Sequence, residues 1–274
     1  IFIINMLTFN LSVSNREVFN NLEFPVQIMP QQQKMLTLPF IRSFPSMKEW
    51  SESVIHTSYI VKIWNPEIND PASKVYLNMK FYLELALKIK FKRILVHLPN
   101  TEKEWSNLDV GMKRMIELFN KFYEKSDKNI KIVFEIPAFV SNFKMNIHEY
   151  IDKVLIYQKQ FANSFEIVFD TAHLYSNGLE ADDMLELIKK YKDHSKIIHL
   201  NGNLRDKYTS DKHIQIFSEK SKIKNIDSLM NYFSESDLIL IAENTSIHEN
   251  YDSWKEFSNK YKLKIIPFIK ELSL

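Results

Sequence analysis

Metal-binding residue types close six short apolar stretches of this 274-residue chain. The residues that end these stretches are His56, His97, Glu135, Asp170, His199 and Glu243. All six have side chains that bind divalent metal ions through nitrogen or oxygen. If the stretches are parallel β-strands, their carboxyl ends meet on one rim of the sheet. The pattern therefore predicts a metal site on that rim.

Two local motifs extend this set of donors. Asp170-Thr-Ala-His173 puts a second donor one helical turn beyond a strand end, and Asp211-Lys-His213 puts two donors on the same side of an extended segment. The nine candidate metal ligands are then His56, His97, Glu135, Asp170, His173, His199, Asp211, His213 and Glu243. One catalytic zinc ion takes about three protein ligands, so nine ligands with a shared carboxylate suit about three ions.

The chemistry of the donors narrows the metal and the substrate. Imidazole and carboxylate without thiolate fit zinc or manganese better than copper or iron–sulfur chemistry. Four carboxylates among three divalent ions would leave a surplus of positive charge at the rim. Such a charge is complementary to a phosphodiester, whose attacking and leaving oxygens each need a Lewis acid.

Eight apolar, β-branched stretches recur along the chain and predict strands buried on both faces. They are Leu7–Val13, Phe24–Met29, Ser53–His56, Arg93–His97, Lys131–Glu135, Phe165–Asp170, Lys196–His199 and Leu238–Glu243. Segments of helical period lie between most of them, at Ser73–Lys90, Glu104–Glu124, Asn146–Phe161 and Ala181–Lys192. This alternation predicts an α/β fold of the (β/α)8 TIM-barrel type, with a doubly wound open sheet as the alternative. Pro39 and Pro45 are expected to shorten the second helix.

The composition excludes several classes of site. The chain has three glycines, too few for a phosphate-binding loop of the P-loop or dinucleotide type. Two of them, Gly178 and Gly202, follow candidate ligands closely and predict sharp turns or close backbone approaches there. The absence of cysteine from the sequence excludes disulfides, thiolate metal sites and a cysteine nucleophile.

Charge and hydropathy add little about partners. The chain has 36 basic and 34 acidic residues, and this nearly even balance does not by itself indicate nucleic-acid binding. No apolar run approaches the roughly 18 to 20 residues of a membrane span, so we expect no membrane partner. We expect one domain over residues 1–274, with residues 1–6 as an N-terminal extension before or at Met6, and an intracellular rather than secreted protein.

Seven motifs, in chain order, resemble those of the endonuclease IV family of apurinic/apyrimidinic (AP) endonucleases, also called AP endonuclease family 2. They are His56-Thr-Ser-Tyr59, His97-Leu-Pro99, Phe134-Glu-Ile-Pro137, Asp170-Thr-Ala-His173, His199-Leu-Asn-Gly202, Asp211-Lys-His213 and Ala242-Glu-Asn244. Single short motifs are weak, but Asp-Thr-x-His followed by His-Leu-Asn and then Asp-x-His is a specific combination. Members of this family are (β/α)8 enzymes with three zinc ions.

The resemblance implies three Zn²⁺ ions per chain, with Mn²⁺ as a substitute, and catalytic roles for Glu135 and Glu243. It implies that the ions are held by His56, His97 and Glu135, by Glu135, Asp170, His199 and Glu243, and by His173, Asp211 and His213. The implied partner is double-stranded DNA that contains abasic sites. The implied reaction is hydrolysis of the backbone 5′ to the abasic site in base-excision repair, which leaves a 3′-hydroxyl and a 5′-deoxyribose phosphate. Activity as a 3′-repair diesterase and a monomeric state are further implications.

The same resemblance places two DNA-contacting side chains beyond the metal ligands. Lys34 follows a run of glutamines, and Tyr59 lies three residues after His56. Both match positions that enter the duplex while the abasic nucleotide is extruded into the site. An abasic nucleotide has lost its base and therefore its pairing, so its extrusion costs least.

Two other functions stay open on the sequence. A xylose-isomerase-like sugar isomerase or epimerase also uses one or two divalent ions on such a barrel, but it would not need His173, Asp211 and His213. A non-catalytic relative that binds abasic DNA is the other alternative. The loop Ile214–Lys220, which lacks the glycine turn usual in the family, allows this alternative.

Overall fold

Eight parallel strands close into a barrel in the computed structural model, which describes residues 6–12, 27–30, 37–43, 53–58, 61–62, 64–125, 130–140, 146–163, 165–243, 255–256 and 258–261. In chain order the barrel strands are β1 (Met6–Ser12), β2 (Gln27–Met29), β3 (Val54–His56), β4 (Arg93–His97), β5 (Lys131–Glu135), β6 (Glu166–Asp170), β7 (Ile197–His199) and β10 (Ile239–Ala242). Each pairs with its neighbour in this order, and β10 pairs with β1. The predicted (β/α)8 barrel is confirmed, and the alternative of a doubly wound open sheet is wrong.

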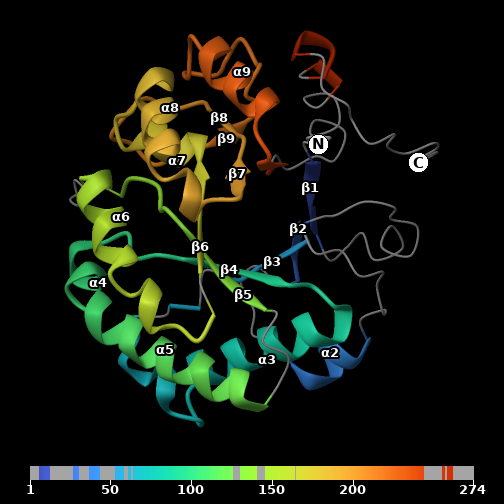
Figure 1. Cartoon of the computed structure of the whole chain (residues 1–274), viewed down its shortest axis with the longest axis vertical. Coiled ribbons are helices and arrows are strands. Elements are labelled where there is room, and N and C mark those ends of the chain that lie inside the picture. Colours follow the sequence, from blue (N-terminus) through green and yellow to red (C-terminus); the bar gives the residue numbers. More distant parts are fainter. Residues whose placement is uncertain are drawn as a thin grey trace.

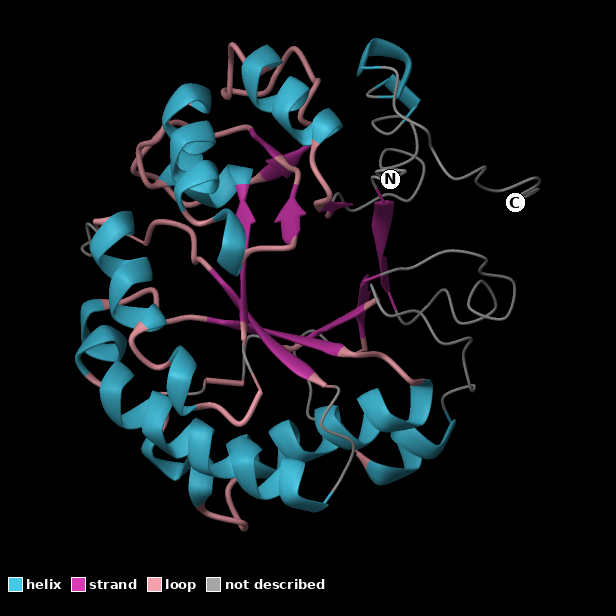
Figure 2. Cartoon of the chain, in the orientation of Figure 1, coloured by secondary structure: helices cyan, strands magenta, loops and turns pink. Residues whose placement is uncertain are grey.

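Helices lie on the outside of the barrel in an arc that runs from α2 to α9 (Figures 1 and 2). They are α2 (Leu38–Ser43), η2 (Pro66–Asn69), α3 (Lys74–Ile89), α4 (Glu102–Ser106), α5 (Leu108–Lys125), α6 (Ile147–Leu155), η3 (Gln158–Gln160), α7 (Thr171–Ser176), α8 (Ala181–Lys190), η4 (Lys192–His194) and α9 (Asp227–Glu235). A separate antiparallel pair, β8 (Gly202–Asn203) and β9 (His213–Ile214), follows β7. In the described segments, no helix has the length and apolarity that a membrane span requires.

The predicted helices differ from the observed ones mainly where a turn interrupts the apolar period. The single helix predicted over Glu104–Glu124 is two helices, because Asn107 leaves helical geometry between α4 and α5. The helix predicted to run to Phe161 ends at Leu155 and is followed by η3. Pro39 is the second residue of the short helix α2, a position in the first turn where a missing N–H costs nothing.

The register of the strands decides which side chains face the barrel interior. His97 lies opposite Glu135, and Asp170 lies opposite His199. In the other strand pairs, the residue opposite a predicted ligand lies two positions before the predicted ligand of the next strand. His56 is opposite Leu95, Glu135 opposite Val168, and His199 opposite Ile241. Side chains alternate along a strand, so offsets of zero and two keep one face. All six strand-ending residues therefore share the interior face at one height.

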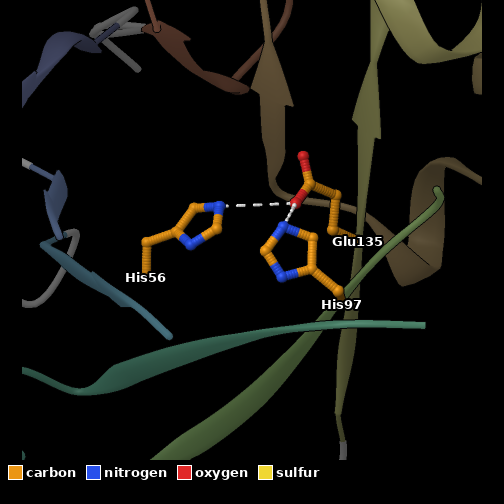
Figure 3. Close-up of side chains that lie close together, drawn as sticks. All are labelled: His56, His97 and Glu135. Carbon is orange, nitrogen blue, oxygen red and sulfur yellow. Dashed lines mark ion pairs between the residues drawn. The ribbon is translucent and has the colours of Figure 1, made fainter. Parts of the chain in front are cut away.

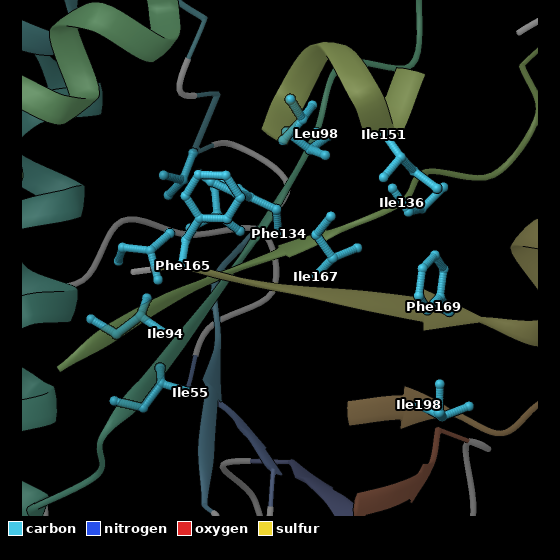
Figure 4. Close-up of a cluster of buried hydrophobic side chains, with 14 of the residues drawn as sticks. Ile55, Ile94, Leu98, Phe134, Ile136, Ile151, Phe165, Ile167, Phe169 and Ile198 are labelled. Atoms are coloured by element: carbon cyan, nitrogen blue, oxygen red, sulfur yellow. The ribbon is translucent and has the colours of Figure 1, made fainter. Parts of the chain in front are cut away.

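An apolar layer fills the barrel directly beneath that height. The buried cluster consists of Val54, Leu95, Val133, Val168, Ile197, Ile239 and Ile241. The alternate residues of the same strands pack outward against the helices, as Phe134, Ile167, Phe169 and Ile198 do in Figure 4. Burial on both faces explains why the strands read as nearly continuous apolar stretches.

A charged trio lies at the amino-terminal end of the strands, below the apolar layer. Arg93 Nε donates to Glu166 Oε2 at 2.9 Å, and Lys131 Nζ donates to Glu166 Oε1 at 3.1 Å. Burial would raise the pKa of Glu166, but the hydrogen bonds and charges of Arg93 and Lys131 outweigh burial and lower it. The trio contributes to stability only while Glu166 is ionised.

We expect Glu166→Gln to destabilise the protein by about 2 kcal/mol at pH 7, because the charge-assisted hydrogen bonds are lost. The folded-state pKa of Glu166 is depressed, so its contribution is complete above its unfolded pKa and is lost as pH falls below about 4. The difference in unfolding free energy between the two proteins should therefore shrink in acid. Denaturant unfolding at pH 7 and pH 3 measures it. The exposed Glu186→Gln is the control, and an equal loss in both variants would contradict the prediction.

Candidate metal centre

The structure brings all nine predicted ligands together at the carboxyl ends of the strands. Eight of them form three groups in which one donor atom from each residue lies within 4.8 Å of the others. The groups are His56, His97 and Glu135; Glu135, Asp170, His199 and Glu243; and Asp170, His173 and His213. Asp211, the ninth residue, contacts both histidines of the last group.

The first group joins strands β3, β4 and β5 (Figure 3). Glu135 Oε2 lies 3.1 Å from His97 Nε2 and 3.4 Å from His56 Nε2. Ligands bound tetrahedrally to zinc at about 2.0 to 2.1 Å stand about 3.3 Å apart. The spacing and the chemistry of these donors fit a zinc ion.

The second group surrounds His199 Nδ1 with carboxylate oxygens. Glu135 Oε1 lies 2.9 Å away, Glu243 Oε2 3.0 Å and Asp170 Oδ2 3.7 Å. Glu135 turns its other oxygen, Oε2, toward the first group. Its carboxylate thus lies between two groups, in the arrangement that the resemblance implies for a shared ligand.

The third group differs in one residue from the implied set. His213 Nε2 lies 3.0 Å from Asp211 Oδ2, and His173 Nε2 lies 3.8 Å from the same oxygen. Asp170 Oδ2 is 3.7 Å from His213 Nε2 as well. Asp170 therefore adjoins both the second and the third group, whereas the sequence motifs assigned it to the second alone.

Asp170 is fixed by the helix that it begins. As the N-cap of α7, its Oδ1 accepts hydrogen bonds from the backbone N–H groups of Ala172 at 2.7 Å and His173 at 3.1 Å. Capping satisfies N–H groups that have no partner within the helix. The Asp-Thr-x-His motif uses one carboxylate to start the helix that carries the next donor, and Oδ2 is left to face the groups.

Backbone carbonyls orient two of the histidines. His56 Nδ1 lies 2.9 Å from the carbonyl oxygen of Thr57, and His173 Nδ1 lies 2.9 Å from that of Ile136. A carbonyl oxygen can only accept, so Nδ1 carries the hydrogen. In the neutral ring Nε2 then has the free lone pair, and Nε2 faces the carboxylate of Glu135 in His56 and that of Asp211 in His173.

Two buried amides that the sequence analysis did not identify also contact the ligands. Asn201 Nδ2 donates to Asp170 Oδ2 at 2.7 Å, and Asn201 Oδ1 accepts from the backbone N–H of Glu243 at 2.9 Å. Gln27, on β2, lies 3.0 Å from His199 Nε2 and donates to Glu243 Oε1. Asn201 stands in the His-Leu-Asn motif, and Gln27 interrupts an apolar strand, so both carried a signal in the sequence.

The buried carboxylates and histidines of the three groups shift one another's pKa values. Burial would lower the pKa of His199, but the charges of Glu243 and Glu135 raise it well above its ordinary value. Burial would raise the pKa of Glu135, but the charge of His199 and its hydrogen bond keep it well below the ordinary value. Burial also works against His213, whose pKa is nevertheless raised to about 10, chiefly by the charge of Asp170. Divalent ions would displace such protons on binding.

Two glycines shape the loops beside the third group, as the sequence predicted. A Cβ at Gly202 would lie 2.7 Å from both the Gln215 carbonyl oxygen and Ser221 Oγ. Gly178 has a φ of +103°, and a Cβ there would clash with the ring of Tyr208. The backbone N–H of Tyr208 donates to the carbonyl oxygen of Ser176 at 2.7 Å. These contacts join the loop that leads to Asp211 to the end of α7.

A cleft of about 240 Å³ opens beside the first and third groups. It is lined by Lys62, Trp64, His97, Leu98, Asn100, Pro137, Ala138, Phe139, Val140, His173, Ser210 and Asp211. The side chains of Asp211 and His213 are 26% and 22% exposed, whereas those of Asp170 and His199 are 0% exposed. A substrate would therefore reach the groups from the side of the third group. Lys34 and Tyr59, the predicted DNA contacts, lie outside the described residues.

Comparisons with known proteins agree with the fold. No protein-family model and no curated protein sequence matches the chain. Endonuclease IV from Thermus thermophilus is similar with a TM-score of 0.65 and 16% identity, over 94% of this chain and 99% of that one. A D-tagatose 3-epimerase-like protein gives 0.63 and 18%, over 93% and 98%. The IOLI protein, solved with a zinc atom, gives 0.58 and 13%, over 94% and 95%. The chain thus shares the TIM-barrel fold of these proteins.

The shared carboxylate of Glu135 predicts how metal content responds to mutation. We expect Glu135→Gln to remove two zinc ions per chain, because a neutral amide is a poor ligand and the residue adjoins two groups. His56→Ala, which affects one group, should remove one ion. Elemental analysis after dialysis at controlled free Zn²⁺ measures both, with the exposed His148→Ala as the control. Equal losses from the first two variants would contradict a shared role for Glu135.

Proposed function

We propose that this chain is a metal-dependent AP endonuclease that hydrolyses the backbone of double-stranded DNA 5′ to an abasic site. The products would be a 3′-hydroxyl and a 5′-deoxyribose phosphate. One observation carries the proposal: three donor groups adjoin one another on a single rim and share the carboxylates of Glu135 and Asp170. A three-ion centre suits a phosphodiester, where charge develops on several oxygens at once.

The residues of the chain would have distinct roles in this reaction. Bound Zn²⁺, or Mn²⁺ in its place, would act as a Lewis acid toward the phosphodiester and lower the pKa of a bound water. Glu135 sets the spacing of the first two groups through its two oxygens. Glu243, held by Gln27 and by the backbone contact to Asn201, presents its carboxylate from the end of β10. We assign Glu135 and Glu243 as catalytic residues.

The cleft supports a small, partly apolar substrate fragment. Its volume of about 240 Å³ is below the roughly 300 to 1,000 Å³ of pockets for drug-sized ligands. A fragment of the size of a sugar-phosphate would fit in such a volume. Trp64 and Phe139 offer apolar surface, while Asn100 and Ser210 offer hydrogen bonds to phosphate or sugar oxygens. An extruded abasic nucleotide would therefore find both apolar surface and hydrogen-bonding groups in the cleft.

The third group favours a nuclease over a sugar isomerase or epimerase. The second group alone would be enough for a one-ion sugar enzyme, and an epimerase-like protein shares the fold. His173, Asp211 and His213 would have no task in such an enzyme. We also propose that the protein acts as a monomer inside the cell in base-excision repair, with 3′-repair diesterase activity as a secondary reaction. A relative that binds abasic DNA without cutting it is the remaining alternative.

An incision assay on a duplex with one abasic site tests the proposal. We expect a single cut 5′ to the lesion, abolished by a chelator and restored by Zn²⁺. Glu243→Gln should slow cutting at least about 100-fold, because one oxygen of the second group is lost. The matched intact duplex is the control for the substrate, and Glu186→Gln is the control for the protein.

Three results would contradict the proposed endonuclease. Cutting that is unaffected by the chelator would exclude a metal centre. Tight binding of the abasic duplex without cutting would identify a non-catalytic binder. Metal-dependent interconversion of ketose sugars, with no incision of DNA, would identify an epimerase or isomerase.

The proposed DNA contacts are tested separately from the chemistry. We expect Tyr59→Ala to weaken binding of the abasic duplex about tenfold while zinc content stays unchanged, because a ring stacked in the duplex contributes about 1 to 3 kcal/mol. Lys34→Ala should have a smaller, salt-dependent effect. Fluorescence anisotropy with a labelled duplex measures both. Unchanged affinity of Tyr59→Ala would refute its predicted role.

A further inference from the structure

One polar side chain interrupts the apolar layer beneath the candidate metal centre. Gln27 on β2 lies opposite Val54 on β3, which belongs to that layer. Gln27 is 0% exposed. A primary amide buried in an apolar layer is costly unless its hydrogen bonds are made. The hydrogen-bond partners of Gln27 should therefore explain why an amide is buried at this position.

Both ends of the amide contact residues of the second donor group. Gln27 Nε2 donates to Glu243 Oε1, and Gln27 Oε1 lies 3.0 Å from His199 Nε2. An ionised carboxylate can only accept, so the amide NH₂ must face Glu243 and the amide oxygen must face His199. His199 must then carry a hydrogen on Nε2. This leaves Nδ1 as the nitrogen that faces Glu135, Asp170 and Glu243.

Two other histidines of the centre, each held by a backbone carbonyl, show the opposite arrangement. The carbonyl oxygens hold the hydrogen on Nδ1 of His56 and His173 and leave Nε2 to face the carboxylates. His199 has a side-chain amide where they have a backbone carbonyl. The direction of its ring therefore depends on the residue at position 27.

We infer that Gln27 is a positioning residue that selects Nδ1 of His199 as a metal ligand and fixes the Glu243 carboxylate beside it. The inference rests on the proposed metal centre but not on the substrate. A ligating histidine commonly donates its second N–H to a neighbouring acceptor, and loss of that acceptor typically lowers metal affinity about 10- to 100-fold. Gln27 does this for His199 and also donates to a second ligand of the same group.

An amide is the side chain that can make both contacts. Glutamate at position 27 would accept from His199 but would place a second carboxylate against Glu243. Methionine would fill similar space without either hydrogen bond. The two substitutions thus separate the tautomer of His199 from the orientation of Glu243.

Zinc binding and the ring nitrogens of His199 test the inference without any DNA. We expect the wild type to hold three ions and Gln27→Met to bind one of them about 10- to 100-fold more weakly in competition with a chelator. Nitrogen-15 spectra of the zinc-loaded protein should show hydrogen on Nε2 of His199 in the wild type. This assignment should persist in Gln27→Glu, whose affinity at the same site should also fall. In Gln27→Met the preference should be lost.

Asn78→Leu, which removes another buried amide, on α3 and outside the three groups, is the matched control and should leave all three ions in place. Circular dichroism checks that each variant is folded. Unchanged zinc affinity in folded Gln27→Met, or hydrogen on Nδ1 of His199 in the wild type, would overturn the inference. So would a wild type that binds no zinc at the second group. A wild type that holds three ions but does not cut abasic DNA would overturn the proposed function alone.

Discussion

The centre depends on the parity of the strand register. Neighbouring strands are offset so that each residue at a strand end faces either the next such residue or the residue two positions before it. A slip of one residue at any boundary would turn a ligand away from the barrel interior and into the helix layer. The apolar layer below resists that slip, because the same shift would carry its aliphatic side chains outward. The strand register that packs the barrel interior is therefore the same register that brings the donors together.

Electrostatics gives the buried donors a common need for positive charge. Glu135, Asp170 and Glu243 lie within a few ångströms of one another in a region from which water is largely excluded. The raised pKa of His199 reflects this need, because a protonated imidazole would place positive charge beside the carboxylates. Because Glu135 and Asp170 each adjoin two groups, occupancy of one group changes the field at the next. We therefore expect the affinity of each group for its ion to depend on whether the neighbouring group is occupied.

Much of the fold and of the donor set could be predicted from sequence. Parallel strands buried on both faces are apolar, so the first polar residue after each marks the rim and reveals residues such as His97 and Asp170. No local sequence pattern specifies the strand register. The contacts of Asp170 with both the second and the third group follow from that register. Gln27 was missed because it lies at the amino-terminal end of β2, whereas the predicted ligands lie at the carboxyl ends of their strands. The break at Asn107 was missed because the apolar period of the flanking helices continues across it.

The contact between Tyr208 and Gly178 bears on how this chain can change over evolutionary time. The two positions are thirty residues apart, yet the ring of one occupies the space that any side chain at the other would need. The φ of +103° at Gly178 also disfavours any side chain, so a smaller residue at position 208 alone would not make a larger residue tolerable at position 178. Homologous chains with a large ring at position 208 should consequently keep glycine at position 178, and an isolated change at 178 should be rare. The loop that carries Asp211 is constrained in the same way because it contains Tyr208, although neither residue of the pair is a candidate ligand.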